Sequence, residues 1–413
     1  MKILVVSNIY PPFVLGGYEL LAKDVVEALR ARGHVVDVLT TTADAAPEPG
    51  VHRTLHLARK FGHDAGRDRV RHLWTGWRNA RATRDYLRAE GRPDVALMMS
   101  QRRLGLEPWW ALQRAGVPVV ATVNDDWPVA YCASRRDGLS GLLRRFVDDL
   151  PSGRRLRGLR PERVVWLSDA VRREVRRAGA PLADGDVVPQ GVDATLFRPR
   201  AFRPIGPRPR LLFVGRLHPS KAPDVAIEAV AQLVRRGVDA TLGIHGAPFD
   251  DAYGAALQEL AQRLGVADRV DFRGFCPRPQ LPDVLRKSDA LLFASRLEHE
   301  GQGLTYLEAM ACGLPVVAWP AGGAREFLDA HPAVVRTAAC SGAAFADAVQ
   351  GLIAGGAAAQ EALVTKGLAV VNDHASISTY ATRLEAELED ARALAVGAQG
   401  SSPRRSDGSV VSA

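Results

Sequence analysis

Two glutamates eight positions apart, Glu300 and Glu308, bracket a glycine-rich turn in the stretch EGQGLTYLE. Carboxylates placed in this way can accept hydrogen bonds from the hydroxyls of a sugar and of a ribose, while the backbone N–H groups between them can reach a phosphate. A second explanation needs no ligand, because Thr305-x-x-Glu308 also fits a helix capping box. Both explanations stay open at this point.

Two cations, Arg216 and Lys221, follow an apolar run in the stretch FVGRLHPSK. We expect Arg216 just past the end of a strand and Lys221 at the start of the next helix. Cations in these positions can neutralise a diphosphate and the charge that grows as a nucleoside diphosphate leaves. A Walker A loop is excluded, because no glycine directly precedes Lys221. Ordinary surface charge is the alternative.

A glycine pair, Gly16 and Gly17, follows the first apolar run and opens the first expected helix. Backbone N–H groups and the positive end of that helix would suit an anionic group there. The spacing is not GxGxxG, which argues against a dehydrogenase. A purely structural turn is the alternative.

The composition describes a folded protein of two domains. The chain has 413 residues, of which 47% are hydrophobic and 24% charged, values typical of globular proteins and enough for two domains of roughly 200 residues. The four cysteines have no zinc-site spacing and indicate reduced thiols in the cytosol. We expect neither an export signal nor a membrane span.

The formal charge of +8 is unevenly distributed, with arginines crowded between residues 135 and 163. Such a patch suits anionic lipid headgroups, nucleic acid or an acidic acceptor. A solvated face in an arginine-rich protein explains it equally well.

Strand and helix patterns alternate in both halves of the chain, which predicts two parallel sheets in the α/β class. The proline-rich stretch between residues 197 and 210 separates the halves. We therefore expect a first domain over 1–200, a second over 208–375, a helix over 376–396 that packs back on the first domain, and a disordered tail over 397–413. Strands are expected at 2–7, 35–41, 95–100, 117–123, 163–167, 211–214, 240–244, 290–294 and 315–319. Helical patterns cover 17–32, 222–236, 253–264, 342–371 and 376–394.

The pair of glutamates with its continuation EAMACGLPVVA resembles the E-x7-E motif of retaining GT-B glycosyltransferases of family 4. Other pieces of the chain follow in the order of that family, among them GG-x-E at Gly16, the stretch PQGVD, Gly274-Phe275, and Gly322-Gly323 with Glu326. The resemblance extends to about residue 390. It implies two Rossmann-like parallel-sheet domains facing across a cleft, and transfer of a sugar from a nucleotide diphosphate donor to an acceptor hydroxyl with retention of configuration.

The resemblance also implies roles for single residues. Arg216 and Lys221 match the diphosphate pair, Glu308 the ribose carboxylate, and Glu300 the contact to the donor sugar. The remaining donor-binding positions are Gly16, Gly17, Phe275, Cys276, Gly303, Leu304 and Thr305, of which Phe275 and Cys276 would flank the nucleobase.

The chain departs from the family pattern at three positions. Asn124 stands where many relatives carry a histidine near the reacting sugar, Gln190 replaces the usual Asn, and Ala222 the usual Gly after the lysine. Acceptor loops are expected at 61–77 and 124–136. Their aromatic residues Trp74, Trp77, Trp127 and Tyr131 either stack on sugars or belong to the core.

No metal or other cofactor is expected, because side chains supply the cations and no Asp-x-Asp pair ends a strand. Asp125 and Asp126 are adjacent, and adjacent side chains on an extended segment point apart. The expected partners are a nucleotide sugar and a sugar, lipid-linked or small-molecule acceptor, but not nucleic acid. The expected location is the cytoplasm, with peripheral contact to an anionic inner membrane face left open. A nucleotide-sugar epimerase and a catalytically silent binding module are the alternative functions.

Overall fold

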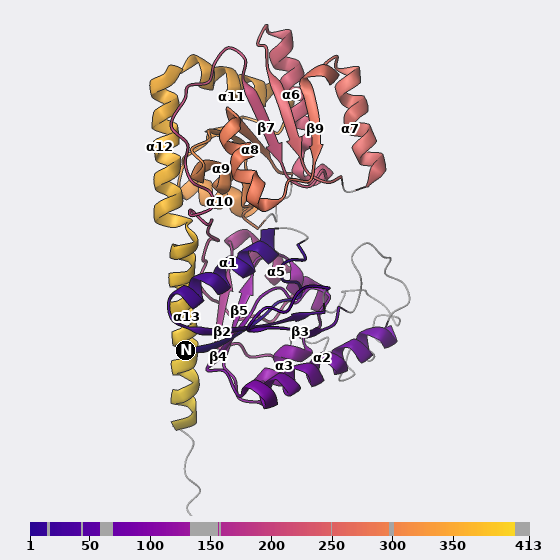
Figure 1. Cartoon of the computed structure of the whole chain (residues 1–413), viewed down its shortest axis with the longest axis vertical. Coiled ribbons are helices and arrows are strands. Elements are labelled where there is room, and N and C mark those ends of the chain that lie inside the picture. The colour runs from indigo at the N-terminus through magenta and orange to yellow at the C-terminus, as the bar shows by residue number, and fades with distance from the viewer. Residues whose placement is uncertain are drawn as a thin grey trace, which may run out of the picture.

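The computed structural model describes residues 1–14, 17–42, 44–57, 69–132, 156, 158–248, 250–296 and 301–400. Two lobes, each built on one parallel sheet, follow each other along the chain (Figure 1). Among the described residues, no helix is both long and apolar enough to cross a membrane.

The first lobe contains a six-stranded sheet in the order β3-β2-β1-β4-β5-β6, with all pairs parallel. Its strands are β1 (Lys2–Val6), β2 (Val35–Thr41), β3 (Val51–Leu55), β4 (Val95–Met98), β5 (Val119–Val123) and β6 (Arg163–Trp166). Its helices are α1 (Gly17–Ala31), α2 (Arg69–Glu90), α3 (Glu107–Arg114), η1 (Trp127–Tyr131) and α5 (Asp169–Arg177).

Both faces of this sheet are covered, which explains why its central strands are continuous apolar runs. Along β1, Ile3 and Val5 join the cluster under α1, while Leu4 and Val6 join the opposite cluster with Trp109 of α3. Successive side chains of a strand point to opposite faces, so this single apolar run contributes to two cores.

The second lobe repeats the strand order of the first, as β12-β11-β10-β7-β8-β9. Its strands are β7 (Arg210–Val214), β8 (Thr241–His245), β9 (Val270–Gly274), β10 (Ala290–Ala294), β11 (Val316–Trp319) and β12 (Val335–Arg336). Its helices are η2 (Pro219–Lys221), α6 (Pro223–Arg235), α7 (Asp251–Arg263), η3 (Ala267–Arg269), η4 (Arg278–Gln280), α8 (Leu281–Lys287), α9 (Thr305–Ala311), α10 (Gly322–Ala330), α11 (Gly342–Ala354) and α12 (Gly356–His374).

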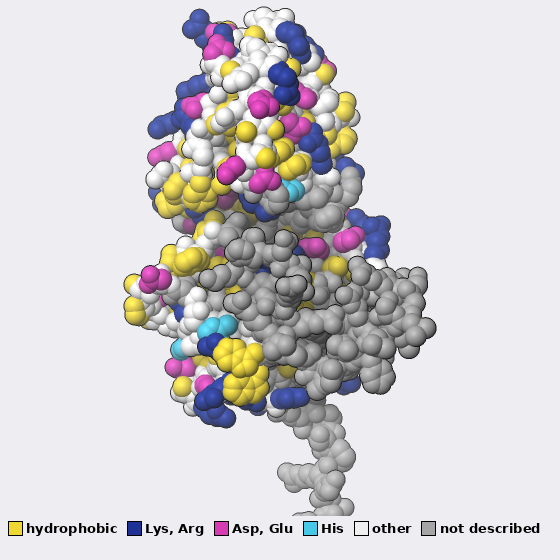
Figure 2. All heavy atoms as spheres, turned by 90° about the vertical axis from the view of Figure 1, so that its right-hand side faces the viewer, with side chains coloured by type: hydrophobic (Ala, Val, Ile, Leu, Met, Phe, Trp, Pro, Cys, Tyr) yellow, Lys and Arg dark blue, Asp and Glu magenta, His cyan; other side chains and the backbone are white. Residues whose placement is uncertain are grey.

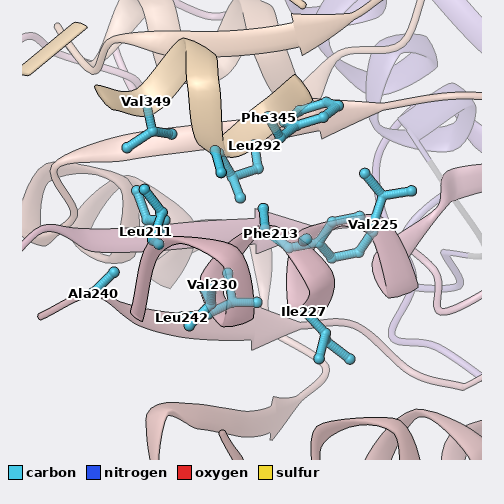
Figure 3. Packing of buried hydrophobic residues seen from close by; sticks show 14 of the residues in the cluster. Leu211, Phe213, Val225, Ile227, Val230, Ala240, Leu242, Leu292, Phe345 and Val349 are labelled. Atoms are coloured by element: carbon cyan, nitrogen blue, oxygen red, sulfur yellow. The ribbon is translucent and has the colours of Figure 1, made fainter. Parts of the chain in front are cut away.

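Helices α6 and α11 cover one face of the second sheet. Figure 3 shows Val225 and Val230 of α6 and Phe345 and Val349 of α11 gathered around Phe213 and its neighbours on the strands. The opposite face is covered by α8, α9, α10 and α12. In both lobes, the first strand of the domain lies at the centre and the order reverses beside it, which is where ligands bind in open α/β sheets.

The last helix, α13 (Ile377–Gly400), leaves the second lobe and packs on the first, beside α1 (Figure 1). Tyr380, Leu384, Leu388 and Ala391 are buried there. The crossing is fixed where Val192 N–H donates to Ala375 O (2.8 Å) and Ile377 N–H donates to Val192 O (2.9 Å). Both connections between the lobes therefore run side by side.

Two expectations about the end of the chain are wrong. The helical pattern over 342–371 is divided into α11 and α12 at Gly356, whose φ of +71° interrupts the helix. Residues 397–400, expected in a disordered tail, continue α13, and no proline interrupts the helix there. Residues 401–413 lie outside the described part.

Candidate active site

The two lobes meet through glycines at the carboxyl ends of the strands. A Cβ at Gly17, the first residue of α1, would lie 2.8 Å from Cδ1 of Leu304 in the second lobe. A Cβ at Gly301 would lie 2.7 Å from the backbone oxygen of Asn124. The start of α1 and the loop after β5 therefore lie directly against the turn that precedes α9.

The cationic pair lies in the loop between β7 and α6. Arg216 is exposed and Lys221, at the end of η2, is half-buried. His218 caps η2, since its Nδ1 accepts from the N–H of Ser220 (3.1 Å). Ala222 adopts the left-handed conformation with φ of +50°, which favours glycine and explains why the family usually has glycine here.

Arg296 ties this loop to the loop after β10, a role that the sequence analysis missed. The Arg296 guanidinium makes two hydrogen bonds to Asp224 (3.0 and 2.7 Å). The backbone N–H of Arg296 donates to the backbone oxygen of Ser220 (2.8 Å). Since β7 and β10 are neighbours in the sheet, the turn that carries Lys221 is held beside the segment leading to Gly301. An arginine two residues past a strand was the available signal.

The glycine-rich turn ends at α9, and its geometry contradicts the capping box. Leu304 occupies the N-cap position without a side-chain cap, and Thr305 is the first residue of the helix. Glu308 is buried and its carboxylate makes no hydrogen bond that the structure records among the described residues. Burial raises the pKa of Glu308 to about 7, an effect opposed by Arg278 and reinforced by Asp24. Gly303, with φ of +74°, allows the turn.

Phe275 and Cys276 follow β9 at the edge of the second sheet. The Phe275 ring is 68% exposed, while Cys276 is half-buried. An exposed ring at this edge of the sheet is free to stack on a planar group. Two further predicted residues, Glu300 and Gly16, lie outside the described residues.

The first-lobe aromatic residues do not share one role. Trp127 is fully buried and its Nε1 donates to the backbone oxygen of Thr122 (3.4 Å), while the Tyr131 hydroxyl donates to Gln101 O (2.5 Å). These two rings support the first lobe, so the hypothesis that they stack on an acceptor is wrong for them. Trp74 and Trp77 are exposed on α2.

Arg102 lies beside both of the adjacent aspartates, Asp125 and Asp126. Its Nη2 lies 3.5 Å from Asp125 Oδ1 and forms a shorter ion pair with Asp126. The argument that these two side chains diverge is therefore wrong, since both approach one guanidinium. Burial raises the pKa of Asp125. In the described part of the chain, no three His, Cys, Asp or Glu side chains are grouped as a metal site would require.

Asn124 and Ser168 are the remaining first-lobe residues next to the meeting point of the two lobes. Asn124 is buried, and its Nδ2 has no hydrogen-bond partner among the described residues. Ser168 caps α5 by accepting from the N–H of Val171 (3.3 Å). Glu326 of α10 accepts from the N–H of Ala170 (3.0 Å) and pairs with Arg173. The two lobes are thus joined by polar contacts beside the glycine-rich turn.

Comparisons with known proteins agree with this geometry. A sequence profile described as Glycosyltransferase Family 4 matches residues 15–196, and one described as Glycosyl transferases group 1 matches residues 208–355. The chain is 31% identical over 336 residues to a D-inositol 3-phosphate glycosyltransferase of Thermomonospora curvata, covering 75% of this chain and 76% of that protein. It is 36% identical over 176 residues to a GDP-mannose-dependent alpha-(1-6)-phosphatidylinositol monomannoside mannosyltransferase of Mycolicibacterium smegmatis, covering 40% and 45%.

Solved structures share the fold. HepE of Anabaena in complex with UDP and glucose superposes with a TM-score of 0.67 at 20% identity, covering 94% of this chain and 99% of that one. Sucrose-phosphate synthase of Thermosynechococcus elongatus gives 0.69 at 20% identity, covering 95% and 99%. The predicted GT-B fold of two Rossmann-like parallel-sheet domains is confirmed. The chain belongs to glycosyltransferase family 4.

Proposed function

We propose that this protein transfers a sugar from a nucleoside diphosphate sugar to an acceptor hydroxyl with retention of the anomeric configuration. The observation that supports this most is the meeting of three loops at the centre of the molecule. The Arg216–Lys221 loop is bound through Arg296 to the segment after β10, and Gly17 lies against Leu304 of the following turn. The cationic loop, the segment after β10, and the start of α1 with the turn before α9 therefore lie at the carboxyl ends of the strands.

The proposed chemistry is a substitution on one face of the sugar. The acceptor oxygen forms a bond to the anomeric carbon as the bond from that carbon to the phosphate oxygen breaks. The acceptor proton passes to the departing phosphate oxygen, so no enzyme nucleophile is needed. Arg216 and Lys221 then stabilise the negative charge that grows on the diphosphate.

The donor side is assigned by residue. Glu308 binds the ribose hydroxyls, the backbone of Gly303, Leu304 and Thr305 faces the phosphates, and Phe275 with Cys276 flanks the nucleobase. The relatives named above use GDP-mannose or glycosylate an inositol phosphate, and HepE was solved with UDP. We therefore propose UDP- or GDP-hexose as the donor and a hydroxyl of a polyol, sugar or lipid-linked sugar as the acceptor.

A thermal-shift screen with UDP, GDP, ADP and their hexose conjugates tests the donor class. A bound donor raises the free energy of unfolding by RT ln(1 + [L]/Kd). We expect the melting temperature to rise with one nucleoside diphosphate and its hexose conjugates. The rise should persist in excess chelator, since no metal is proposed. No shift with any of them would contradict the proposal. NMR of the product's anomeric centre then tests retention, and incubation of the donor without acceptor tests the epimerase alternative.

We also propose peripheral contact with an anionic membrane, supported by the reversed polarity of α2. The helix buries Thr75, Asn79 and Thr83, while Trp74 and Trp77 are 59% and 55% exposed. Asn79 fixes this orientation, because its Oδ1 accepts from His56 N–H (2.8 Å) and its Nδ2 donates to Leu104 O (2.8 Å). The indoles are therefore held outward. Exposed aromatic groups of this size commonly mark an interaction surface.

The charges beside the indoles favour an anionic lipid surface. Arg78 lies over the Trp74 ring at 4.7 Å and Arg81 over the Trp77 ring at 5.9 Å. Figure 2 shows hydrophobic side chains of the lower, first lobe beside Lys and Arg side chains. Indole and guanidinium together match the apolar and anionic layers of a membrane interface. Most of the predicted basic patch at 135–163 falls outside the described residues, which include Arg160 and Arg163.

Vesicle flotation tests this contact. Vesicles that contain about 30% anionic lipid should retain the protein, and zwitterionic vesicles should not. Trp74→Ser with Trp77→Ser should weaken retention, while melting temperature stays close to wild type because both rings are exposed. Equal retention by both vesicle types would contradict the proposal.

A further inference from the structure

A buried histidine, His245, ends strand β8 with an unpaired ring nitrogen. The residue is only 9% exposed, and its Nδ1 is buried without a hydrogen-bond partner among the described residues. A buried polar atom that makes no hydrogen bond lowers the free energy of unfolding, and most buried polar atoms in folded proteins have a partner. The imidazole is therefore a position where a polar group from outside the chain would be stabilising.

The backbone holds His245 between two segments already assigned to the donor. On one side, the N–H of Gly215, directly before Arg216, donates to His245 O (3.0 Å). On the other side, His245 pairs in register with Gly274, directly before Phe275. A ligand that extends from the cationic loop to the Phe275 ring therefore crosses the end of β8.

The side chain of His245 lies on the face of the second sheet that α9 covers. Leu242 and Ile244 of β8 belong to the cluster under α6 and α11, in which Figure 3 labels Leu242. Successive side chains of a strand point to opposite faces, so His245 points to the other face. Its in-register neighbour Val214 packs against the cluster of that face, as does Cys276. The ring thus shares a face with the helix that carries the proposed ribose carboxylate.

The chemistry of the ring suits a nucleobase better than a diphosphate. Burial lowers the pKa of His245, the Arg273 guanidinium lowers it further, and Asp271 opposes both with a smaller effect. An imidazole that is neutral near pH 7 donates from one ring nitrogen and accepts at the other. The polar edges of nucleobases carry both donors and acceptors, whereas phosphate oxygens only accept and favour a cation.

We propose that His245 is a specificity-determining residue that contacts the nucleobase of the donor from the end of β8. This inference rests on the proposed use of a nucleoside diphosphate sugar as the donor. The exposed Phe275 ring offers a stacking surface to any base, because every base has a π-face. The imidazole instead distinguishes bases by the hydrogen-bonding groups on their edges, since a base that mismatches it leaves a buried polar group unpaired.

Calorimetric titration of the full chain with UDP, GDP, ADP and inorganic pyrophosphate tests the inference. His245→Phe keeps a flat ring and removes both ring nitrogens. Its Kd for the nucleoside diphosphate that the wild type binds most tightly should rise about 3- to 10-fold, the size expected for one hydrogen bond. Its Kd for pyrophosphate, which has no base, should be unchanged. The other two nucleoside diphosphates should be affected less, so the discrimination among the three narrows.

Two further variants and the melting temperature separate base recognition from packing. His245→Gln retains a donor and an acceptor and should keep most of the wild-type affinity. The melting temperature of His245→Phe should equal or exceed that of the wild type, because an unpaired buried polar atom is removed. His331→Phe is the control, since His331 is a half-buried histidine that stacks on His374 after α10, and it should leave every Kd unchanged.

Three results would contradict the inference. Wild-type affinity of His245→Phe for the preferred nucleoside diphosphate would overturn it directly. An equal loss of affinity for the nucleoside diphosphate and for pyrophosphate would also overturn it, because the ring would then act through the cationic loop and not through the base. A wild-type protein that binds pyrophosphate but none of the three nucleoside diphosphates would contradict the proposed donor class itself, and with it the role of His245.

Discussion

The two lobes share one strand order but use their switch-point loops differently. In the first lobe, polar side chains of the loops after β1 and β4 form hydrogen bonds to the backbone of the same two loops. Asn8 Nδ2 donates to Arg102 O (3.0 Å), and Gln101 Nε2 donates to Met99 O (3.1 Å). In the second lobe, the loops after β7 and β10 carry Arg216 and Lys221 and are held by the Arg296–Asp224 pair. The same architecture thus supplies shape on one side and charge on the other.

This difference predicts that substitutions in the second-lobe loops lower the rate of sugar transfer, whereas substitutions in the first-lobe loops lower the free energy of unfolding. Lys221→Ala should lower kcat by about 10²–10³, or ~3–4 kcal/mol in the transition state, if the lysine acts as a preorganised stabilising cation. Single-turnover transfer measures this, with the melting temperature as the control for folding. A Lys221→Ala protein with the wild-type rate would contradict the proposal that the second-lobe loops supply the charge for the reaction.

Glu308→Gln should improve stability while it weakens donor binding. Burial raises the pKa of Glu308 from 4.5 to about 7 in the folded protein, so the neutral form favours folding. The stability that this group contributes is complete below about pH 4.5 and is lost as the pH rises through 7. The variant should therefore gain roughly 1–3 kcal/mol over wild type between pH 5 and pH 8.

Urea unfolding at pH 5, 6, 7 and 8 measures this gain. Glu361→Gln, on an exposed position of α12, corrects for the loss of one negative charge. Parallel curves for wild type and Glu308→Gln at every pH would contradict the expected cost of the buried carboxylate.

Asn8→Ala tests the first lobe. The side chain is buried, donates to Arg102 O and accepts from the N–H of Ile9 (2.9 Å), so its removal leaves unpaired backbone groups. The free energy of unfolding should fall by about 1–2 kcal/mol, while UDP or GDP affinity stays within a few-fold. A loss of nucleotide affinity without a loss of stability would show that this loop contributes more than shape.

Ala222→Gly is expected to have the smallest effect. Alanine in the left-handed region is strained, but glycine increases the entropy of the unfolded chain and the buried methyl group is lost. The net gain in stability should stay below about 1 kcal/mol. Thermal unfolding of the two proteins decides the sign, and a clear destabilisation would mean that packing of the methyl group outweighs the backbone strain.

The sequence predicted the centre of each sheet better than its edges. Central strands such as β2 and β10 are apolar runs, and the expected bounds 35–41 and 290–294 agree with the structure. The expected strands omit β3, β9 and β12, which lie at sheet edges and mix charged with apolar residues, because one side of each lacks a neighbouring strand. An edge strand needs less apolar surface and leaves a weaker pattern.

The candidate site was accessible from sequence only where its residues are local. The glycine-rich turn and the Arg216–Lys221 loop are short stretches with recognisable spacing. The ion pair between Asp24 of α1 and Arg278 of η4 joins residues 254 positions apart, and no local pattern indicates that these two helices meet. The capping box failed for a related reason, since Thr305-x-x-Glu308 describes a helix start without specifying which residue is the N-cap.

The return of α13 to the first lobe has a consequence for biosynthesis. The face of the first sheet formed by Ile3 and Val5 is completed by Leu384 and Leu388, which leave the ribosome long after the strands they cover. A nascent chain therefore carries an unfinished apolar face in its amino-terminal half while the second lobe is still being made. Emergence of α13, rather than emergence of its own strands, sets the moment at which the first lobe can become fully folded.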